Sequence, residues 1–446
     1  MVAGRRKFLI RGGLLVDSKG VRSSDLLVEG GKIAACEKEI DPPSGAKVVD
    51  ARGLVVSPGF VDLHTHLRQP GSEKSETISS GSRAGVSGGY TALLAMPNTI
   101  PTIDSPEVVS YVRQLAREAA LDVYFAGAIT KGRLGESLTE MSKMAELGIR
   151  LFTDDGTGVQ DGQLMRRALE YAKGIGVTLA QHCEDLALSN GGAMNEGAVS
   201  SVLGMKGIPN AAEDVMVARD IELVRLTGAR LHLLHISTGR SAEMVRAAKA
   251  DGLPVTAEVT PHHLVLSEQR LGDFNPIFKV NPPLRSDADR LALWGALGQG
   301  TFDAIATDHA PHHKEAKDTT LDQAAFGMIG LESALGAVLG EMQRQGAEQV
   351  VAGGGLPDEQ LMKLVGLFTW RPARIAQIDD VHGGPLVVGR PANIAIFDPT
   401  LKWRLSEAEI VSRSKNSPYF DTDLVGKVLY TFVSGDLKLS EGELCL

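Results

Sequence analysis

Short runs of apolar residues, interrupted by polar positions and glycine turns, occur at both ends of the chain. Runs of this kind are typical of β-strands that bury one face, because successive side chains of a strand point to opposite faces. The pair Gly30-Gly31 is one of the turn signals between them. The predicted strands are Lys7–Ile10, Gly13–Val16, Asp25–Glu29, Lys32–Cys36 and Lys47–Asp50 near the start, and Asn393–Phe397, Lys427–Val433 and Lys438–Leu439 near the end.

The middle of the chain, roughly residues 58–380, has a different pattern, in which apolar strand-like runs alternate with helical stretches. One helix is predicted to begin at the capping residue Ser105, with Pro106 in the first helical position. The predicted strands are Phe60–His64, Thr91–Met96, Val123–Ile129, Ile149–Thr153, Thr178–His182, Arg230–His235, Val255–Val259 and Phe302–Thr307. The predicted helices are Ser105–Ala119, Gln163–Lys173, Glu213–Leu226, Ser241–Ala250 and Asp287–Leu297.

Eight strands that alternate with helices indicate βα units and therefore a parallel sheet. The predicted fold class is α/β, and about 320 residues favour a closed (β/α)8 TIM barrel over a doubly wound open sheet. Neither terminal segment is long enough to bury a good core alone. We therefore expect residues 1–57 plus 385–446 to form a small β-sandwich domain, and residues 58–384 to form the catalytic barrel, with a helix-rich part at 331–377.

The composition excludes several classes of protein. Of the 446 residues, 43% are hydrophobic and 23% are charged, as in an ordinary globular chain and unlike a disordered one. The formal net charge of −9 argues against nucleic acid or an anionic membrane as a partner, since both require a basic face. No apolar run approaches the ~18 residues of a membrane span. The three scattered cysteines, Cys36, Cys183 and Cys445, make no disulfide framework and indicate a cytoplasmic protein.

Polar side chains with metal-binding chemistry follow several of the predicted strands. In a barrel, functional side chains are expected at the carboxyl ends of the strands. His64 and His66 end the first strand, and a spacing of two points both side chains the same way. Asp154 and Asp155 end the fourth strand; alternation allows only one of them to point inward, and the residues themselves do not choose between the two. The fifth, sixth and eighth strands end in His182, His235 and Asp308.

Each of these residues has an ordinary structural explanation when it is taken alone, such as a turn or a hydrogen-bonded side chain. Their occurrence at the same end of five different predicted strands is what favours a shared metal site. Imidazole and carboxylate ligands suit zinc, which binds nitrogen at about 2.0–2.1 Å. Six ligands are too many for one tetrahedral ion, so the pattern predicts a two-metal site.

These segments resemble the amidohydrolase superfamily and, within it, the bacterial class I dihydroorotases. The run SPGFVDLHTHLR at Ser57–Arg68 is similar to the opening signature of the superfamily. The matches occur in the right order over nearly the whole chain. The segments that resemble dihydroorotase are HLRQPG at His66–Gly71, MPNT at Met96–Thr99, FTDDG at Phe152–Gly156, AQHCED at Ala180–Asp185, HIST at His235–Thr238, NPPLR at Asn281–Arg285 and DHAPH at Asp308–His312.

The resemblance implies two zinc ions per subunit, bridged by Asp155 and a hydroxide. Many members of the superfamily carry a carboxylated lysine at the fourth strand, but Ile149–Asp155 contains no lysine. An aspartate in this role matches the class I dihydroorotases and departs from hydantoinases and allantoinases, and we follow the family pattern in choosing Asp155 over Asp154. The implied ligands are His64, His66 and Asp308 for one ion, and His182 and His235 for the other.

The resemblance also implies a reaction, the reversible hydrolysis of dihydroorotate to N-carbamoyl-L-aspartate in de novo pyrimidine biosynthesis. Bound zinc would polarise the amide carbonyl and lower the pKa of coordinated water from about 15.7 towards about 7. Asp308 is expected to take the proton of the hydroxide and to deliver it to the leaving ring nitrogen. An anionic substrate on an acidic protein requires a cationic pocket. The expected substrate contacts are Arg68, Asn98 and His312 for the carboxylate, and Asn281 for the ring amide edge.

Two alternatives stay open. A hydantoinase or an allantoinase is the nearest one, although the missing lysine and the presence of Arg68 and Asn98 argue against it. The other is a catalytically silent homologue that serves as a scaffold for aspartate transcarbamoylase; such a protein should have lost metal ligands, whereas this chain retains all six. An active enzyme is in turn expected to be a homodimer, with a complex with aspartate transcarbamoylase as a further possibility.

Overall fold

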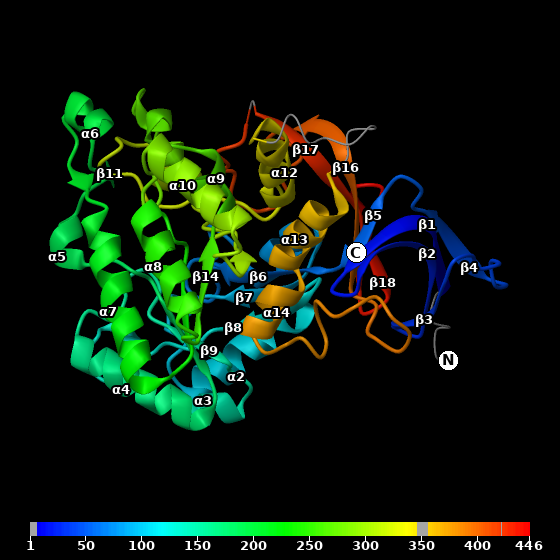
Figure 1. Ribbon diagram of the computed structural model, residues 1–446, viewed down its shortest axis with the longest axis horizontal. Helices are drawn as coiled ribbons and strands as arrows, with labels where there is room; N and C mark the ends of the chain where they lie inside the picture. Colours follow the sequence, from blue (N-terminus) through cyan, green and yellow to red (C-terminus); the bar gives the residue numbers. More distant parts are fainter. Residues whose placement is uncertain (1–6, 346–355, 421) are drawn as a thin grey trace.

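The computed structural model describes residues 7–345, 356–420 and 422–446. Strands and helices alternate along the chain, so the fold is α/β as the sequence predicts. Figure 1 shows a sheet-rich part on one side and parallel strands surrounded by helices on the other. Over the described ranges, no helix combines the length and the apolar character that crossing a membrane requires.

Within the described residues, one nine-stranded sheet takes strands from both ends of the chain. Its two halves meet where β5 (Val55–Pro58) pairs antiparallel with β16 (Ile394–Arg404). Figure 1 shows the blue N-terminal strands beside the orange and red C-terminal ones. The other strands are β1 (Lys7–Asp17), β2 (Gly20–Glu29), β3 (Lys32–Glu37), β4 (Ala46–Asp50), β17 (Asp423–Val433), β18 (Asp436–Ser440) and β19 (Glu443–Leu444).

Strand β1 differs from the sequence prediction, which divided it into two strands. The structure has one strand with a bulge between Ile10 and Gly13, where the register with β2 shifts. Gly12 within the bulge has a φ of 73°, a conformation that favours glycine. A bulge bends a strand without ending it, so glycine marks a kink here and not a turn.

In the described part of the chain, eight parallel strands lie in a three-stranded sheet (β6-β7-β8) and a five-stranded sheet (β15-β14-β13-β10-β9). Isolated parallel bridges connect the edges of the two sheets: Gly127 pairs with Phe152, and Thr65 pairs with His309. The strands are β6 (Phe60–Thr65), β7 (Tyr90–Ala95), β8 (Asp122–Phe125), β9 (Leu151–Thr153), β10 (Thr178–Gln181), β13 (Leu231–Leu233), β14 (Val255–Val259) and β15 (Ala304–Ile305).

The first and last of these parallel strands are also joined through a buried carboxylate. Asp62 of β6 accepts hydrogen bonds from the backbone N–H of Thr307 (3.1 Å) and from its hydroxyl (2.5 Å). Burial raises the pKa of Asp62 to about 7, although these hydrogen bonds act in the opposite direction. The contact fixes β6 against the segment that leads to Asp308.

Several parallel strands end earlier than predicted. Strand β8 ends at Phe125 instead of Ile129, and β13 ends at Leu233 instead of His235. The backbone N–H of Ile129 donates to the Asp154 side chain (2.9 Å), and so it is unavailable to a neighbouring strand. Hydrogen bonds to polar side chains thus replace the last backbone hydrogen bonds between neighbouring strands. The chain can then leave the sheet and turn across the site.

Helices cover the parallel strands, and the predicted ones are present with shifts of a few residues at their ends. The side chain of Ser105 caps helix α2 by accepting from the N–H of Val108, with Pro106 first in the helix, as predicted. The helices beside the parallel strands are α1 (Ile78–Ser87), α2 (Pro106–Leu115), α3 (Met141–Glu146), α4 (Gly162–Ile175), α7 (Ala211–Thr227), α8 (Gly239–Ala250), α10 (Asp287–Gly298), α12 (Ala334–Gln345), α13 (Asp358–Phe368) and α14 (Trp370–Ile375).

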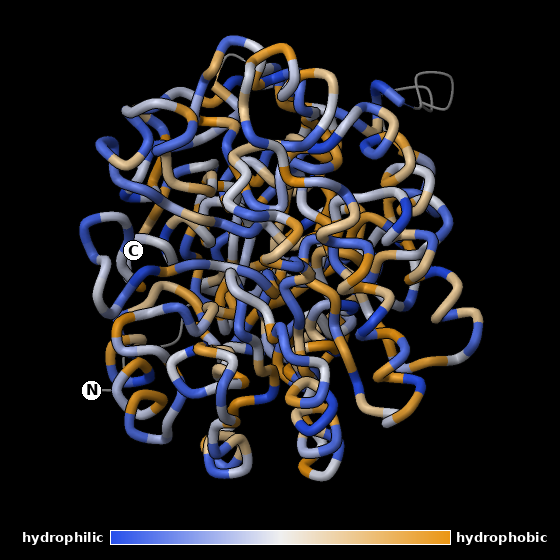
Figure 2. Tube along the Cα trace, turned by 90° about the vertical axis from the view of Figure 1, so that its left-hand side faces the viewer, coloured by the Kyte–Doolittle hydropathy of each residue, from blue (hydrophilic) through white to orange (hydrophobic). Residues whose placement is uncertain are grey.

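Short elements fill the connections between these strands and helices. They are α5 (Leu186–Ser189), β11 (Met194–Asn195), α6 (Ala198–Leu203), β12 (Gly207–Ile208), α9 (Pro261–Val265) and α11 (Lys314–Lys317), with 3₁₀ turns at Ala116–Glu118, Lys131–Arg133, Glu268–Leu271 and Pro276–Phe278. Figure 2 shows hydrophobic stretches concentrated in the interior, and hydrophilic ones mainly along the outer loops.

Candidate metal centre

The six predicted metal ligands come together at the carboxyl ends of the parallel strands. They lie on, or directly after, five different strands, and none exposes more than 6% of its surface. Such burial is costly for ionisable groups unless they are paired or bound to a metal. The six residues are His64 and His66 at β6, Asp155 after β9, His182 after β10, His235 after β13 and Asp308 after β15.

One half of the cluster brings two imidazoles to two carboxylates. His64 Nε2 lies 3.3 Å from Asp155 Oδ1 and 3.6 Å from Asp308 Oδ1. His66 Nε2 lies 3.0 Å from Asp308 Oδ1 and 3.6 Å from Asp155 Oδ2. The ligand atoms of His64, His66 and Asp155 lie within 4.8 Å of one another, close enough to hold one ion.

The other half shares Asp155 with the first. His182 Nδ1 and His235 Nε2 each lie 3.7 Å from Asp155 Oδ1, and the two nitrogens are 2.9 Å apart. These three residues form a second group whose ligand atoms lie within 4.8 Å of one another. Asp155 is therefore placed to contact two ions, one in each half of the cluster.

Asp154, which the pattern of residues did not distinguish from Asp155, has a different position. Its carboxylate accepts hydrogen bonds from the backbone N–H of Ile129 (2.9 Å) and of Thr130 (3.0 Å), and from the hydroxyl of Thr130. Asp154 thus connects the ends of the third and fourth parallel strands, whereas the Asp155 carboxylate faces the cluster.

The donor atoms of the cluster fit a cation. His64 Nδ1 is hydrogen-bonded to the Glu258 carboxylate (2.8 Å), so it carries the proton. In the neutral imidazole, the form that binds a metal, His64 Nε2 then has the lone pair, and it is a buried atom with no hydrogen-bond partner in the described structure. Nitrogen lone pairs aimed at carboxylate oxygens repel them unless a proton or a cation lies between. Imidazole and carboxylate ligands suit a divalent metal ion such as zinc.

The electrostatics of the cluster also favour the charged carboxylates. Burial opposes ionisation of Asp155 and Asp308, but the neighbouring imidazoles, His64 first among them, lower the pKa of both well below the ordinary value. His182 shows the reciprocal effect: burial lowers its pKa, but Asp155 and Glu184 outweigh burial and raise it to about 9. The cluster therefore holds two carboxylates that are ready to bind a cation.

Three residues of the site have a left-handed backbone, which is uncommon outside glycine. The φ angles are 61° for Arg68, 32° for His235 and 46° for Asp308. Non-glycine residues in this region cost of order 1–3 kcal/mol each and occur preferentially at functional sites. The turns aim these three side chains at the centre of the strand ends.

Three of the four predicted substrate contacts lie next to the first half of the cluster. Arg68 Nη2 lies 3.3 Å from His312 Nε2, and Arg68 Nε donates to the carbonyl of Pro311 (3.1 Å). Asn98 Oδ1 accepts from His66 Nδ1 (3.0 Å). Burial, followed by the charge of Arg68, lowers the pKa of His312 to about 3, so this imidazole is neutral.

The fourth predicted contact, Asn281, lies next to the second half of the cluster. Its Nδ2 donates to Glu184 Oε2 (2.7 Å), and the same oxygen accepts from His182 Nε2 (2.9 Å). The cluster therefore has a cationic side, with Arg68, and an amide side, with Asn281.

Three comparisons with known proteins agree with this arrangement. A family model described as Dihydro-orotase-like matches residues 53–241. A curated protein named dihydroorotase from Geobacter sp. (strain M21) is 44% identical over 97% of this chain and 99% of its own length. One of the same name from Streptomyces coelicolor is 43% identical over 98% of this chain and 99% of its own.

The chain belongs to the dihydroorotase family.

Solved structures of other cyclic-amide hydrolases share the fold of this dihydroorotase family member. The L-hydantoinase of Arthrobacter aurescens has a TM-score of 0.87 at 25% identity, over 98% of this chain and 97% of that one. The dihydropyrimidinase of Brevibacillus agri has a TM-score of 0.84 at 22% identity, over 98% of this chain and 96% of that one. The shared fold is consistent with the hydantoinase alternative that the sequence leaves open.

Two buried glutamates of this family member contact the cluster but were not predicted from the sequence. Glu258 of β14 contacts His64 Nδ1 and also His232 Nε2 (3.0 Å), and Glu184 contacts His182. Carboxylates of this kind fix the orientation of metal-binding imidazoles. Each had a signal: Glu258 is a charged residue within an otherwise apolar strand, and Glu184 follows His182 at a spacing of two.

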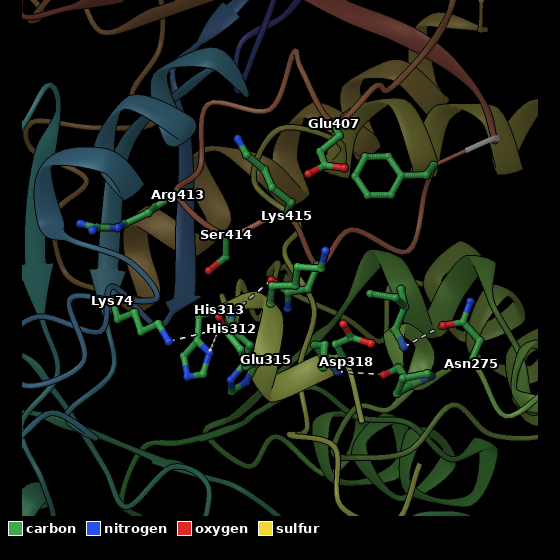
Figure 3. A pocket seen from close by; sticks show the side chains of 16 residues that line it. Lys74, Asn275, His312, His313, Glu315, Asp318, Glu407, Arg413, Ser414 and Lys415 are labelled. Atoms are coloured by element: carbon green, nitrogen blue, oxygen red, sulfur yellow. Dashed lines mark hydrogen bonds and ion pairs between the residues drawn. The ribbon is translucent and has the colours of Figure 1, made fainter. Parts of the chain in front are cut away.

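A cavity of about 640 Å³ lies beside the predicted substrate pocket of this family member. His312 lines it together with residues of α11 and of the segment 413–416. Figure 3 shows Lys74, Arg413 and Lys415 around one end of the cavity, and Glu315 beside His313. His312 thus lies between Arg68 and this cavity.

Proposed function

We propose that this chain is a dihydroorotase of the bacterial class I type, which interconverts dihydroorotate and N-carbamoyl-L-aspartate in de novo pyrimidine biosynthesis. The observation that carries the proposal is the 44% identity over 97% of the chain to a curated dihydroorotase. It is supported by the gathering of the six predicted ligands into one cluster. The reaction class is the hydrolysis of a cyclic amide.

The proposed cofactor is a pair of zinc ions. His64, His66 and Asp308 would hold one, His182 and His235 the other, and Asp155 both. When bound, zinc polarises an amide carbonyl and lowers the pKa of coordinated water towards about 7. The positions of Asp155 and of the unpartnered His64 Nε2 support the assignment.

Asp308 is the proposed proton carrier. Its carboxylate lies in the first half of the cluster, 3.0 Å from His66 Nε2, and it is ionised because the neighbouring imidazoles hold its pKa well below the ordinary value. It takes a proton from the attacking water and delivers it to the ring nitrogen as the amide bond breaks. In the biosynthetic direction, the same carboxylate removes that proton as the ring closes.

The substrate carboxylate is proposed to bind on the cationic side of the cluster. The guanidinium of Arg68 can donate two parallel hydrogen bonds to a carboxylate. Asn98 and His312 flank it and complete the pocket. Asn281, on the opposite side, faces the amide edge of the ring. Binding between these two sides would align the scissile amide with the cluster.

The finer features of the fold belong to the same proposal. We propose that the eight parallel strands close into a (β/α)8 barrel over residues 58–384, supported by the Thr65–His309 and Gly127–Phe152 bridges. Residues 1–57 plus 385–446 would form the small β-sandwich domain. A separate cluster of buried apolar residues from both ends of the chain, including Phe8 and Phe432, supports this second unit.

The proposal carries three further predictions: a cytoplasmic location, a homodimer and a complex with aspartate transcarbamoylase. The small-molecule substrate is the partner that the family membership supports. Size-exclusion chromatography with light scattering measures the oligomer, and mixing with the transcarbamoylase measures the complex.

The substrate assignment is tested by turnover of dihydroorotate, hydantoin and allantoin by the same purified protein. We expect ring opening of dihydroorotate to dominate. Opening of hydantoin alone would favour the hydantoinase alternative instead. Metal analysis and dialysis against a chelator complete the test, because activity should be lost with the metal and return with zinc. A metal-free protein that zinc does not activate would be the silent scaffold.

A further inference from the structure

Glu184 contacts a metal-ligand candidate and a substrate-contact candidate with one carboxylate oxygen. Its Oε2 accepts from His182 Nε2 (2.9 Å) and from Asn281 Nδ2 (2.7 Å). The side chain is buried, with 8% of the residue exposed. The contact joins the end of strand β10 to the loop that carries Asn281, which is 97 positions away in the chain.

The contact determines which nitrogen of His182 is free. A carboxylate only accepts hydrogen bonds, so His182 Nε2 carries the proton. In the neutral imidazole, the form that binds a metal, His182 Nδ1 then has the lone pair, and this is the atom that lies 3.7 Å from Asp155 Oδ1 and 2.9 Å from His235 Nε2. The carboxylate therefore selects the tautomer whose free nitrogen faces the cluster.

The same contact determines the orientation of the Asn281 amide. Because Nδ2 donates to the carboxylate, Oδ1 is the amide atom that remains available. No described residue donates a hydrogen bond to Asn281 Oδ1. An available carbonyl oxygen accepts an N–H, and the ring of a cyclic amide or ureide offers such donors.

We propose that Glu184 is a positioning residue that sets the metal-binding tautomer of His182 and, at the same time, turns Asn281 Oδ1 towards a ring N–H of the substrate. The inference rests on the proposed function, since it assigns the second task to a substrate of the cyclic-amide class. It differs from a purely structural role, which would hold the loop but would leave metal affinity and substrate affinity unchanged.

The Glu184→Gln variant separates these roles because it keeps the shape and replaces one acceptor by a donor. If its NH2 group faces the two N–H donors, either His182 or Asn281 must reverse; if its carbonyl oxygen faces them, both contacts persist but lose the charge-assisted strength of a carboxylate acceptor. Reversal of His182 protonates Nδ1 and weakens metal binding, and reversal of Asn281 presents NH2 to the ring. Loss of the partner of a metal-binding imidazole typically costs 10–100-fold in metal affinity or activity.

The experiment measures zinc affinity by competition with a chelator, together with kcat and KM for dihydroorotate. We expect Glu184→Gln to lower zinc affinity about tenfold or more, and to raise KM by a similar factor. Glu184→Asp, which keeps the carboxylate, should recover part of both losses. Glu243→Gln, on the exposed face of α8, is the matched control and should behave as wild type.

A double variant tests the part that acts through Asn281. In the Asn281→Ala background, Glu184→Gln should no longer raise KM, because the amide that it orients is gone. Zinc affinity and KM both equal to those of the Glu243→Gln control would overturn the proposal. If the wild type does not open dihydroorotate, the proposed function fails, but the zinc affinity of Glu184→Gln still tests the assignment at His182.

Discussion

The sheet formed by the two ends of the chain and the cluster at the ends of the parallel strands use buried strands for opposite purposes. In the terminal sheet, the buried residues are mainly apolar, as in the edge-to-face contact of Phe8 with Phe432 at 5.2 Å. In the cluster, the buried residues are histidines and aspartates, and His64 Nε2 has no hydrogen-bond partner in the described structure. Burial of apolar side chains stabilises the terminal sheet, whereas burial of ionisable side chains costs free energy in the cluster.

The difference shows where function is to be sought in this fold. Apolar burial stabilises by about 25 cal/mol per Å² and requires no particular partner. Buried charges are tolerated only where other groups or a bound ion compensate them. Substitutions in the terminal sheet should therefore affect stability, whereas substitutions in the cluster should affect chemistry.

The largest expected effect is that of Asp308→Asn. The variant keeps the volume of the side chain but removes the proton carrier, so kcat for dihydroorotate should fall by about 10³-fold while the fold is retained. Steady-state kinetics and circular dichroism measure the two outcomes. Asp436→Asn, at the exposed start of β18, is the control and should have wild-type turnover. Unchanged kcat in Asp308→Asn would remove the assigned role.

Phe432→Ala tests the prediction that substitutions in the terminal sheet affect stability and leave the chemistry unchanged. Phe432 is fully buried against Phe8, and loss of its ring should cost about 3–5 kcal/mol of stability. Turnover per folded molecule should stay at the wild-type value. Urea denaturation measures the stability, with Leu401→Ala on the exposed part of β16 as the control. A loss of kcat without a loss of stability would contradict the division between the two regions.

Arg68→Met should separate binding from chemistry within the site. Its contact with the substrate carboxylate exists in the ground state and in the transition state alike, so KM should rise about a hundredfold with little change in kcat. Arg240→Met, on the exposed face of α8, provides the control. A fall in kcat at unchanged KM would show that Arg68 acts in the chemical step.

The smallest expected effect concerns Glu332, which shares a cavity with Trp403 and Gly426. Burial raises its pKa from 4.5 to about 7, so the folded state prefers the protonated acid. Folding stability should therefore decrease as the pH rises through this interval, by about 2 kcal/mol between pH 5.5 and 7. Glu332→Gln stays neutral, and its Tm relative to wild type should increase over that range. A Tm difference that is independent of pH would contradict the assignment.

Much of the site could be predicted from the order of residues along the chain. His64 and His66 lie two positions apart on a strand, and His182, His235 and Asp308 each follow a strand. Parallel strands bring their carboxyl ends to one edge, so spacing and strand order were sufficient to place these residues together. The alternation of apolar strands and helices likewise predicted the α/β class.

Other features could not be predicted, since they depend on contacts between distant segments. Asp154 has a different role from Asp155 because it accepts hydrogen bonds from Thr130, which is 24 positions away in the chain. The lengths of β8 and β13 were overestimated, because side chains replace their last ladder bonds. The pattern of apolar residues indicates which positions of a strand are buried, but it does not indicate where the strand ends.

The sequence by itself determined the chemistry available to this protein: imidazoles and carboxylates after strands, an arginine two positions past the histidine pair, and a fourth strand without lysine. Only the tertiary structure decided which nitrogen of each imidazole faces the cluster. That choice depends on Glu258, which is 194 positions from His64, and on Glu184, whose carboxylate also holds Asn281. The ring nitrogen that faces a carboxylate carries the proton, and residue order alone does not specify which carboxylate each imidazole meets in the folded chain.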